Sequence, residues 1–326
     1  MIGVKVRVPA KLNLQLAVGP RRADGYHDLV TVFHAVSLFD EVTVAPARQD
    51  GVEVSGEGAD RIPGGRDNLA LLAVAALRSA MPGQAADRGG VHVTIFKRIP
   101  VAAGLAGGSA DAAAALVACN ELWGGGLSQT ELVEVAAKVG SDVAFALLGG
   151  TAVGRGRGER LTPALAPATA YHWVLAFADG YLSTPEVYAA LDRLRAAEAG
   201  GPKGATGPKG ATGTVRPGAA EPDLDAALMS ALRSGEARRV GRALSNDLQQ
   251  AALSLFPPLR KTLAAGLELG ALGALVSGSG PTCVFLAASA ERALDLAVSL
   301  SGAGVCRSVA RVTGPVPGAA VVPAAK

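Results

Sequence analysis

The chain has 326 residues, a length that predicts two domains because a single hydrophobic core stops growing near this size. Hydrophobic residues make up 49% of it and charged residues 18%, which excludes an intrinsically disordered protein. The 31 basic and 28 acidic residues give a net charge of +3, so the overall charge does not indicate binding to nucleic acid or to an anionic membrane.

The N-terminal region alternates apolar and polar residues, as strands do. Residues 4–8, VKVRV, place three valines on one face of a strand, and residues 12–18, LNLQLAV, repeat the pattern. A turn-rich loop follows, with Asp24-Gly25 as its turn signal. The same patterns then predict two further strands at 30–38 and 40–47, a helix at 67–81 capped by Asp67 or Asn68, and a strand at 91–99.

Residues 98–123, RIPVAAGLAGGSADAAAALVACNELW, lead from small flexible residues straight into an alanine-rich helix. The backbone amides of such a loop can point at one anion, the helix adds its positive end, and Ser109 adds a hydroxyl. No Lys-Ser/Thr pair follows the glycines, so this is not a Walker A motif, and a dinucleotide fingerprint is a poor match. We therefore predict a phosphate-binding loop, with tight packing as the simpler alternative. Residues 277–282, SGSGPT, form a second glycine loop, either an ordinary hairpin turn or a second wall of the same cleft.

The remaining sequence mixes helices and strands. Ser128 and Glu131 have capping-box spacing, so a helix is predicted to begin there. A short helix with Asp142 in its first turn and a glycine-rich hairpin at 149–165 come next. In chain order we then expect a strand at 172–178, helices at 187–197, 224–235, 237–249 and 258–270, a strand and loop within 273–287, a helix at 289–300 and a strand at 308–312. This order predicts an α+β fold rather than a regular βαβ repeat, with domains at residues 1–160 and 161–326.

A repetitive segment interrupts the second domain. Glycine occupies every third position from Gly201 to Gly213, and the hexamer GPKGAT occurs twice. A collagen-like helix needs many more triplets than this segment contains. We therefore expect a flexible surface insertion at about 200–220, remote from the chemistry.

The cysteines and the N-terminus bear on the compartment. Cys119, Cys283 and Cys306 lie far apart, and no CxxC pair or Cys/His spacing indicates a zinc site. A sparse, odd set is typical of a reducing cytoplasm, where such thiols pack as small hydrophobic groups. The N-terminus lacks the order of a signal peptide, and no window reaches the ~20 apolar residues that cross a bilayer. We expect a soluble, cytoplasmic protein without a membrane partner.

Five polar or aromatic residues allow two interpretations each. Lys11 interrupts an apolar run, where an exposed lysine on a half-buried strand is the simpler interpretation taken alone. Asp142 is either an acidic residue favoured by the helix dipole or a general base. His27 fits a surface loop, and Tyr26 and Tyr188 fit plain packing. A functional role stays open as the alternative for the other four as well.

Three blocks of sequence, in this order, resemble the GHMP small-molecule kinases: PAKLNLQL at 9–16, PVAAGLAGGSADAAAAL at 100–116 and VSGSGPTCVFL at 276–286. The first block and ADGYH at 23–27 are similar to the branch that phosphorylates 4-diphosphocytidyl-2-C-methyl-D-erythritol in non-mevalonate isoprenoid biosynthesis. GSDVAF at 140–145 and LSNDL at 244–248 also look like that branch. The resemblance spans essentially the whole chain except the GPKGAT insertion. It implies an N-terminal half like ribosomal protein S5 domain 2, a ferredoxin-like C-terminal half and an ATP-dependent kinase.

The resemblance also implies roles for particular residues. Lys11 and Asp142 fall on the catalytic pair of the family, with Asn13 near the reacting alcohol. The residues implied at the nucleotide are Asn68, Lys97 and the phosphate loop formed by Pro100, Val101, Ala102, Ala103, Gly104, Leu105, Ala106, Gly107, Gly108, Ser109 and Ala110. Those implied at the cytidine end are Tyr26, His27, Thr184, Pro185 and Tyr188.

The implied chemistry is phosphoryl transfer from ATP to the 2-hydroxyl of the methylerythritol unit. Asp142 would take or orient the proton of this tertiary alcohol, and Lys11 would keep the carboxylate ionised and stabilise developing negative charge. Mg²⁺ would bridge the phosphates with few protein ligands, Ser109 being one candidate. Aromatic faces at Tyr26 and Tyr188 would stack on the cytosine, and His27 would read its edge.

The sequence departs from the family pattern at a few positions. Ala102, Ala103 and Ala106 stand where glycine is frequent, and Ala144 stands where a proline is common. None of these changes removes a catalytic side chain.

The alternative functions are a GHMP kinase acting on homoserine, mevalonate or a sugar, a ligand sensor on the same fold, and a nucleic-acid-binding protein. ADGYH disfavours the first, retention of Lys11 and Asp142 the second, and the near-balanced charge the third.

Overall fold

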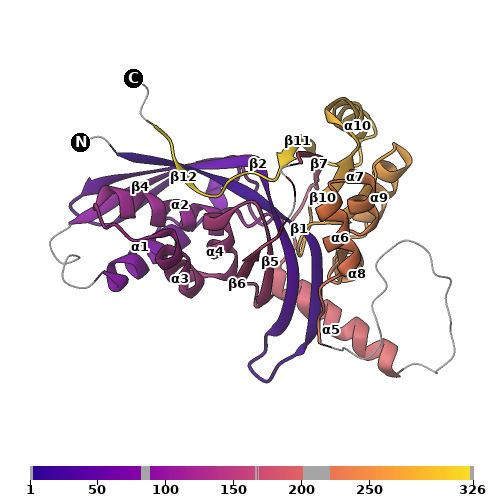
Figure 1. The fold of residues 1–326 in the computed structure, drawn as a ribbon, viewed down its shortest axis with the longest axis horizontal. Coiled ribbons are helices and arrows are strands. Elements are labelled where there is room, and N and C mark those ends of the chain that lie inside the picture. The colour runs from indigo at the N-terminus through magenta and orange to yellow at the C-terminus, as the bar shows by residue number, and fades with distance from the viewer. Residues whose placement is uncertain (1–2, 82–88, 166, 168, 201–220, 324–326) are drawn as a thin grey trace.

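The computed structural model describes residues 3–81, 89–165, 167, 169–200 and 221–323. Two sheets lie along the long axis of the molecule, each with helices against it (Figure 1). The expected insertion at about 200–220 falls almost entirely outside the described residues. Within the described part of the chain, no helix is both long and apolar enough to span a bilayer.

The larger sheet belongs mainly to the N-terminal half. Its strands follow the order β12-β1-β2-β4-β3, with β5 between β2 and β6, and β8 beside β1. The strands are β1 (Val4–Arg21), β2 (His27–Ala47), β3 (Gly51–Gly56), β4 (Gly90–Lys97), β5 (Thr151–Gly156), β6 (Arg160–Pro163), β8 (Ser245–Asn246) and β12 (Ala320–Val321). Because β8 and β12 come from the second half of the sequence, β1 carries contacts from both halves of the chain.

β1 and β2 are longer than the sequence predicted. Each joins two expected strands into one, and register shifts at Pro9/Ala10 and Asn13/Gln15 keep them paired. Such bulges add a residue on one strand and bend it without ending the ladder. Both faces of β1 are buried from Val8 to Leu16, so Lys11 is not an exposed lysine on a half-buried strand.

Four helices lie on one side of the larger sheet (Figure 1). They are α1 (Leu69–Ala80), α2 (Gly107–Leu122), α3 (Gln129–Val139) and α4 (Ser141–Leu148), and a short 3₁₀ turn, Ala59–Arg61, precedes them. α2 packs against β1 and β2 through alanines that are completely buried, which lets the backbones approach closely. The predicted caps are confirmed: Asn68 accepts from the Ala70 amide, and Ser128 and Glu131 form a capping box.

The smaller sheet has four antiparallel strands in the order β11-β7-β10-β9. These are β7 (Tyr171–Phe177), β9 (Gly273–Val276), β10 (Cys283–Ala287) and β11 (Ser308–Gly314), with α5 (Thr184–Gly200), α6 (Ala226–Ser234), α7 (Ala237–Arg242), α8 (Gln249–Leu255), α9 (Leu259–Glu268) and α10 (Ala290–Gly302). A strand order of 4-1-3-2 is the ferredoxin-like arrangement that the sequence implied. The α+β fold class is therefore confirmed.

The hydrophobic core continues from one half into the other. Alternate residues of β7 face opposite ways: Trp173 and Leu175 belong to the core of the larger sheet, while Val174 and Ala176 pack under the helices of the smaller one. Cys119 and Cys283 are buried packing residues, as expected.

The boundary between the two domains, predicted at residue 160, stays a prediction.

One helix prediction is wrong. The segment 237–249 does not form a single helix, because α7 ends at Arg242, β8 pairs in parallel with β1, and α8 begins at Gln249. The Asn246 side chain donates to the carbonyls of Val276 and Gly278, which a helical Asn246 could not reach. Tertiary hydrogen bonds thus override a local helical pattern. Strand β3 was also not predicted.

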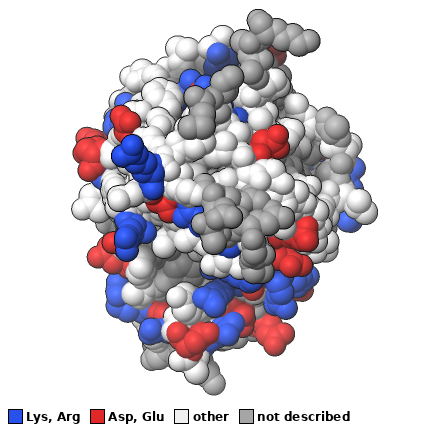
Figure 2. Space-filling view, turned by 90° about the vertical axis from the view of Figure 1, so that its left-hand side faces the viewer, with Lys and Arg blue, Asp and Glu red and all other residues white. Residues whose placement is uncertain are grey.

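Charges of both signs are interspersed on the face of the molecule in Figure 2, without one extended basic patch. Ion pairs such as Lys5–Glu41 and Arg78–Asp50 also bring charges of opposite sign together. The absence of a nucleic-acid partner stays a prediction from the net charge.

Candidate active site

A cavity of about 680 Å³ lies between the two glycine loops, β1, α4 and the start of α5. Most of the residues singled out from the sequence line it, although they come from distant parts of the chain. Those on its wall are Lys11, Asn13, Asn68, Lys97, Pro100, Val101, Ala102, Ala103, Gly104, Ala106, Gly107, Gly108, Ser109, Asp142, Thr184, Pro185 and Tyr188. The fold therefore gathers the predicted catalytic pair, the phosphate loop and part of the predicted cytidine site in one place.

The phosphate loop ends at the N-terminus of α2. Gly107, Gly108 and Ser109 form its first turn, where backbone amides have no acceptor inside the helix. These three residues line the cavity, so amides and the positive helix end face the space that an anion would occupy. Leu105 and Ala110 instead have buried side chains, and the Ala110 amide donates to the Ala106 carbonyl at 2.9 Å.

Two alanines of the loop adopt left-handed backbone conformations. Ala102 has φ 53° and Ala106 has φ 58°, where an L-residue with a Cβ is strained. These are two of the positions at which the sequence departs from the glycine-rich family pattern. The chain therefore keeps the glycine-like backbone path there and accepts the steric cost.

The two glycine loops touch each other. The Ser277 hydroxyl donates to the Gly104 carbonyl at 3.1 Å, and a Cβ on Gly104 would lie 2.1 Å from the Ser277 carbonyl. Gly278 also lies close to Lys11, since a Cβ at this position would be 3.3 Å from the Lys11 ammonium. The second loop is thus a wall of the cavity, the alternative to an ordinary turn. Asn246 holds that wall through two 2.7 Å bonds to the carbonyls of Val276 and Gly278.

Lys11 and Asp142 face each other across the cavity. Lys11 Nζ lies 3.8 Å from Asp142 Oδ2 and donates to Asn13 Oδ1 at 2.7 Å. Asn13 in turn donates to the Thr31 hydroxyl, which donates to the Gln15 carbonyl. Burial lowers the pKa of Lys11, and the Asp142 carboxylate partly opposes that shift. The site therefore holds an ammonium and a carboxylate, each partly stripped of water, with the ammonium oriented by a buried amide.

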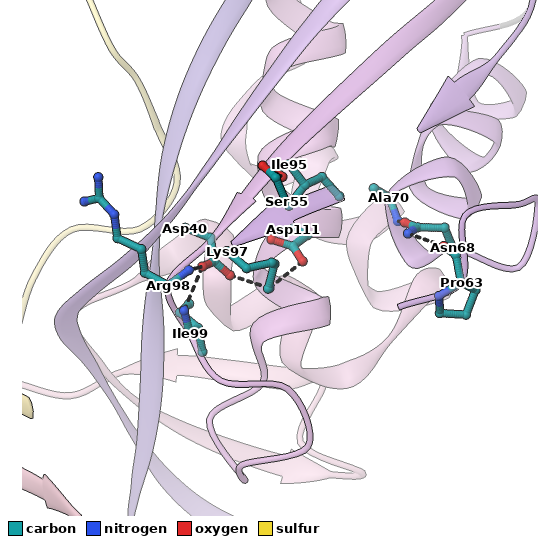
Figure 3. Close-up of polar contacts among 10 residues, drawn as sticks. All are labelled: Asp40, Ser55, Pro63, Asn68, Ala70, Ile95, Lys97, Arg98, Ile99 and Asp111. Carbon is teal, nitrogen blue, oxygen red and sulfur yellow. Dashed lines mark hydrogen bonds and ion pairs between the residues drawn. The ribbon is translucent and has the colours of Figure 1, made fainter. Parts of the chain in front are cut away.

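Lys97 and Asn68 line the same cavity but are already engaged (Figure 3). The Asn68 side chain caps α1 and donates to the Pro63 carbonyl at 2.9 Å. Lys97 Nζ forms ion pairs with Asp40 and Asp111, the second at 2.6 Å. The side chains of Asp40, Lys97 and Asp111 are almost completely buried, although Lys97 and Asp111 are both among the residues that line the cavity.

The predicted cytidine site clusters around Tyr188. Its ring packs against the His27 ring at a centroid distance of 5.1 Å, and His27 Nε2 lies 2.9 Å from Asp192 Oδ1. Burial first, and the Asp142 charge second, raise the pKa of Tyr188, which keeps its hydroxyl protonated. His27 is buried rather than exposed in a surface loop. Thr184 hydrogen-bonds Ser279 of the second glycine loop at 2.9 Å.

Tyr26 is not among the residues that line the cavity, and this residue is 54% exposed. The Arg157 guanidinium sits 4.5 Å from its ring centroid and lines the cavity. Sequence reasoning missed Arg157, and also Asp40, Asp111 and Asn246. The only available signal was chemical, namely the acidic residue Asp111 within the run of alanines directly after the loop.

Comparisons with known proteins show the family to which the chain belongs. The model of the "GHMP kinases N terminal domain" matches residues 68–150, and that of "GHMP kinases C terminal" matches residues 228–306. A protein from Thermobifida fusca, named 4-diphosphocytidyl-2-C-methyl-D-erythritol kinase, is 54% identical over 98% of both chains. A protein of the same name from Mycolicibacterium smegmatis is 54% identical over 98% of this chain and 93% of its own length.

Solved structures give the same result. A crystal structure of 4-(cytidine 5'-diphospho)-2C-methyl-D-erythritol kinase superposes with a TM-score of 0.70 and 34% identity, covering 94% of this chain and 98% of that one. Homoserine kinase from Cytophaga hutchinsonii has a TM-score of 0.71 but 20% identity, over 99% of this chain and 98% of its own, and so shares the fold alone. This chain belongs to the 4-diphosphocytidyl-2-C-methyl-D-erythritol kinase family of the GHMP kinases.

Proposed function

We propose that this chain transfers the γ-phosphoryl group of ATP to the 2-hydroxyl of 4-diphosphocytidyl-2-C-methyl-D-erythritol. The observation that carries the proposal is the pairing of Lys11 with Asp142, 3.8 Å apart, in the cavity that the phosphate loop lines. Phosphoryl transfer needs alignment and charge stabilisation more than covalent catalysis, and this cavity offers both.

Asp142 is the proposed proton acceptor. As the substrate oxygen bonds to the γ-phosphorus, the alcohol proton passes to the Asp142 carboxylate, the bond from that phosphorus to the β-phosphate oxygen breaks, and ADP leaves. Lys11 stabilises the negative charge that develops on the transferring group, and Asn13 holds its ammonium in place. The low exposure of Lys11 strengthens this effect, because water does not screen it.

The phosphates of ATP would bind the first turn of α2. The amides of Gly107, Gly108 and Ser109 face the cavity and lack helical acceptors. On the cavity wall, the Ser109 hydroxyl would be a candidate ligand for Mg²⁺, with phosphate and water oxygens as its other ligands. The ion would neutralise phosphate charge.

The cytidine end would lie over Tyr188. The Tyr188 and His27 rings form an aromatic wall, and Tyr26 with Arg157 forms a second, more exposed one. A base between two rings gains ~1–3 kcal/mol from stacking. Arg157 adds a positive charge that suits the diphosphate or a carbonyl oxygen of the base. A bare alcohol makes none of these contacts.

A coupled assay of ADP release tests the proposal. We expect turnover with 4-diphosphocytidyl-2-C-methyl-D-erythritol and none above background with homoserine, mevalonate, galactose or 2-C-methyl-D-erythritol 4-phosphate. Phosphorus NMR of the product should place the new phosphate on the 2-hydroxyl. Equal or faster turnover of one of the competing alcohols would reject the cytidine-specific function and retain only a GHMP-type kinase.

A further inference from the structure

Three buried charged side chains lie next to the phosphate loop (Figure 3). Asp40 comes from β2, Lys97 from the end of β4, and Asp111 from the second turn of α2. Their side-chain exposures are 0%, 1% and 4%, and Lys97 donates to both carboxylates. The chemistry proposed above uses none of the three.

The group connects the two ends of the phosphate loop. At the entry, one Asp40 oxygen accepts from the Arg98 and Ile99 amides at 2.6 and 2.8 Å, directly before Pro100. At the exit, Lys97 binds Asp111, one residue beyond Ala110. Because Lys97 also binds the other oxygen of Asp40, a continuous path of hydrogen bonds joins the residues that flank the loop.

The stability of the folded protein does not by itself account for these three buried charged side chains. Replacing a buried ion pair by apolar residues is often neutral or stabilising, since the charges lose their hydration. Asp111 Oδ1 also has no hydrogen-bond partner among the described residues, and burial raises the pKa of Asp111 while the Lys97 ammonium opposes that rise. Because burying Asp40, Lys97 and Asp111 costs desolvation free energy, their position beside the phosphate loop indicates a role in holding that loop.

The loop has two features that need such a support. Ala102 and Ala106 hold strained left-handed conformations, which persist only where the surrounding structure imposes them. The backbone of Gly107 also lies close to the three charged side chains. A Cβ at this position would be only 3.1 Å from Lys97 Nζ. Burial lowers the pKa of Lys97, but Asp111 and Asp40 outweigh it and raise the pKa above its usual value, so the cation persists.

We propose that Asp40, Lys97 and Asp111 form a positioning triad that fixes the two ends of the phosphate loop and thereby sets the affinity for the β- and γ-phosphates of ATP. The inference rests on the proposed function, because it assigns the loop to ATP. It differs from a direct contact: the triad acts through the backbone amides of the loop. Its effect should therefore depend on how many phosphates the nucleotide carries.

Calorimetric titration of the purified full chain tests the proposal, with the β,γ-imido analogue of ATP plus Mg²⁺ as one probe and AMP as the other. We expect Asp111→Ala to weaken binding of the analogue at least tenfold and binding of AMP less than threefold. Asp111→Asn keeps an oxygen that accepts from Lys97, so it should bind the analogue within threefold of the unaltered protein. Rescue by Asn separates hydrogen-bond geometry from the net charge.

Thr262→Val is the matched control. It also deletes a buried hydrogen bond, from the Thr262 hydroxyl to the Val305 carbonyl at 2.6 Å, but in the C-terminal half. Both affinities should then be unchanged. Should Asp111→Ala fail to fold by circular dichroism, Asp111→Leu, which fills the volume without an acceptor, carries the same expectation.

Two results would overturn the inference: a folded Asp111→Ala or Asp111→Leu variant that binds the analogue as tightly as the unaltered protein, or one that loses AMP and the analogue in equal proportion. A different result addresses the proposed function instead. If the unaltered protein binds neither nucleotide, the assignment of the loop to ATP is wrong, whatever the variants do.

Discussion

At the scale of single residues, Lys11 and Asp142 derive their chemistry from where the fold places them. Lys11 is 7% exposed, and its ammonium has three neighbours that matter: the Asn13 oxygen, the Asp142 carboxylate and the backbone of Gly278. A lysine on an exposed strand face would be hydrated and mobile. Burial removes that hydration, and the carboxylate opposite compensates in part.

Asp142→Asn tests the assigned base. The amide keeps the size of the side chain but cannot take a proton, so we expect kcat to fall by about 10²–10⁴-fold with little change in the KM for ATP. Steady-state ADP release measures both constants. Asp295→Asn, at an exposed carboxylate on α10, should leave both unchanged. A kcat within threefold of the unaltered protein for a folded Asp142→Asn would exclude the carboxylate as the base.

Ala106→Gly tests the strain in the loop. Ala106 has φ 58°, where glycine avoids a steric cost of about 1 kcal/mol, so the free energy of unfolding should rise by up to ~1 kcal/mol. Ala75→Gly is the control of opposite sign, since this exposed alanine lies inside α1 and its loss should cost about 1 kcal/mol. Urea unfolding measures both. If both variants lose stability equally, the loop backbone is not strained as described.

At the scale of elements, the site depends on contacts between two loops rather than on either loop alone. The loop before α2 directs backbone amides into the cavity. The loop between β9 and β10 places the backbone of Gly278 close to the Lys11 ammonium. β8 links the second loop to the larger sheet. Asn246 of β8 pairs with Leu16 of β1, and its side chain donates hydrogen bonds to the carbonyls of Val276 and Gly278. A substitution in β8 should therefore disturb the positions of Lys11 and Asp142, the proposed catalytic pair.

Asn246→Ala tests this link. It leaves the carbonyls of Val276 and Gly278 without their donor, so we expect a loss of ~2–4 kcal/mol in stability and a kcat at least tenfold lower in the folded fraction. Thermal unfolding and ADP release are the measurements. Asn120→Ala is a matched control, because Asn120 likewise bridges backbone groups of Leu127 but at the far end of α2. It should lose stability alone, and an equal kcat loss there would contradict the link.

At the scale of the whole molecule, the two halves share one interior. His34 of β2 packs edge-on against Tyr171 and Trp173 of β7, with centroid distances of 5.9 and 5.7 Å, and its Nδ1 bonds the Thr151 hydroxyl. Burial lowers the pKa of His34 to about 3. A neutral imidazole is thus part of the contact between β2 and β7.

The pH dependence of stability follows from this histidine. The unfolded chain takes up a proton on His34 below its ordinary pKa of 6.5, whereas the folded protein resists doing so down to about 3. Stability should therefore be fully present above pH 6.5 and fall as the pH drops toward 3, by about 1.4 kcal/mol per pH unit. His34→Asn should reduce this slope by one proton in urea titrations, while His92→Asn, at an exposed site, should not. An unchanged slope in the first variant would contradict a buried neutral His34.

Much of this molecule could be predicted from local patterns. Alternation along β1, the caps at Asn68 and Ser128, and the small residues before α2 all depend on neighbours within a few positions. The α+β class and the phosphate loop followed from their order. The helix predicted at 237–249 failed because Asn246 bonds residues thirty positions away, and no local preference reports such a contact.

The sequence by itself determined most of the elements and pointed to many residues of the candidate site, because hydrophobic periodicity, glycine and capping side chains act over one or two turns. Only the tertiary structure decided that Lys11 is buried opposite Asp142, that the two glycine loops touch, and that Asp40, Lys97 and Asp111 meet next to one of them. Burial, desolvation and close backbone approach depend on segments far apart in the chain. They exist only once the two sheets have packed.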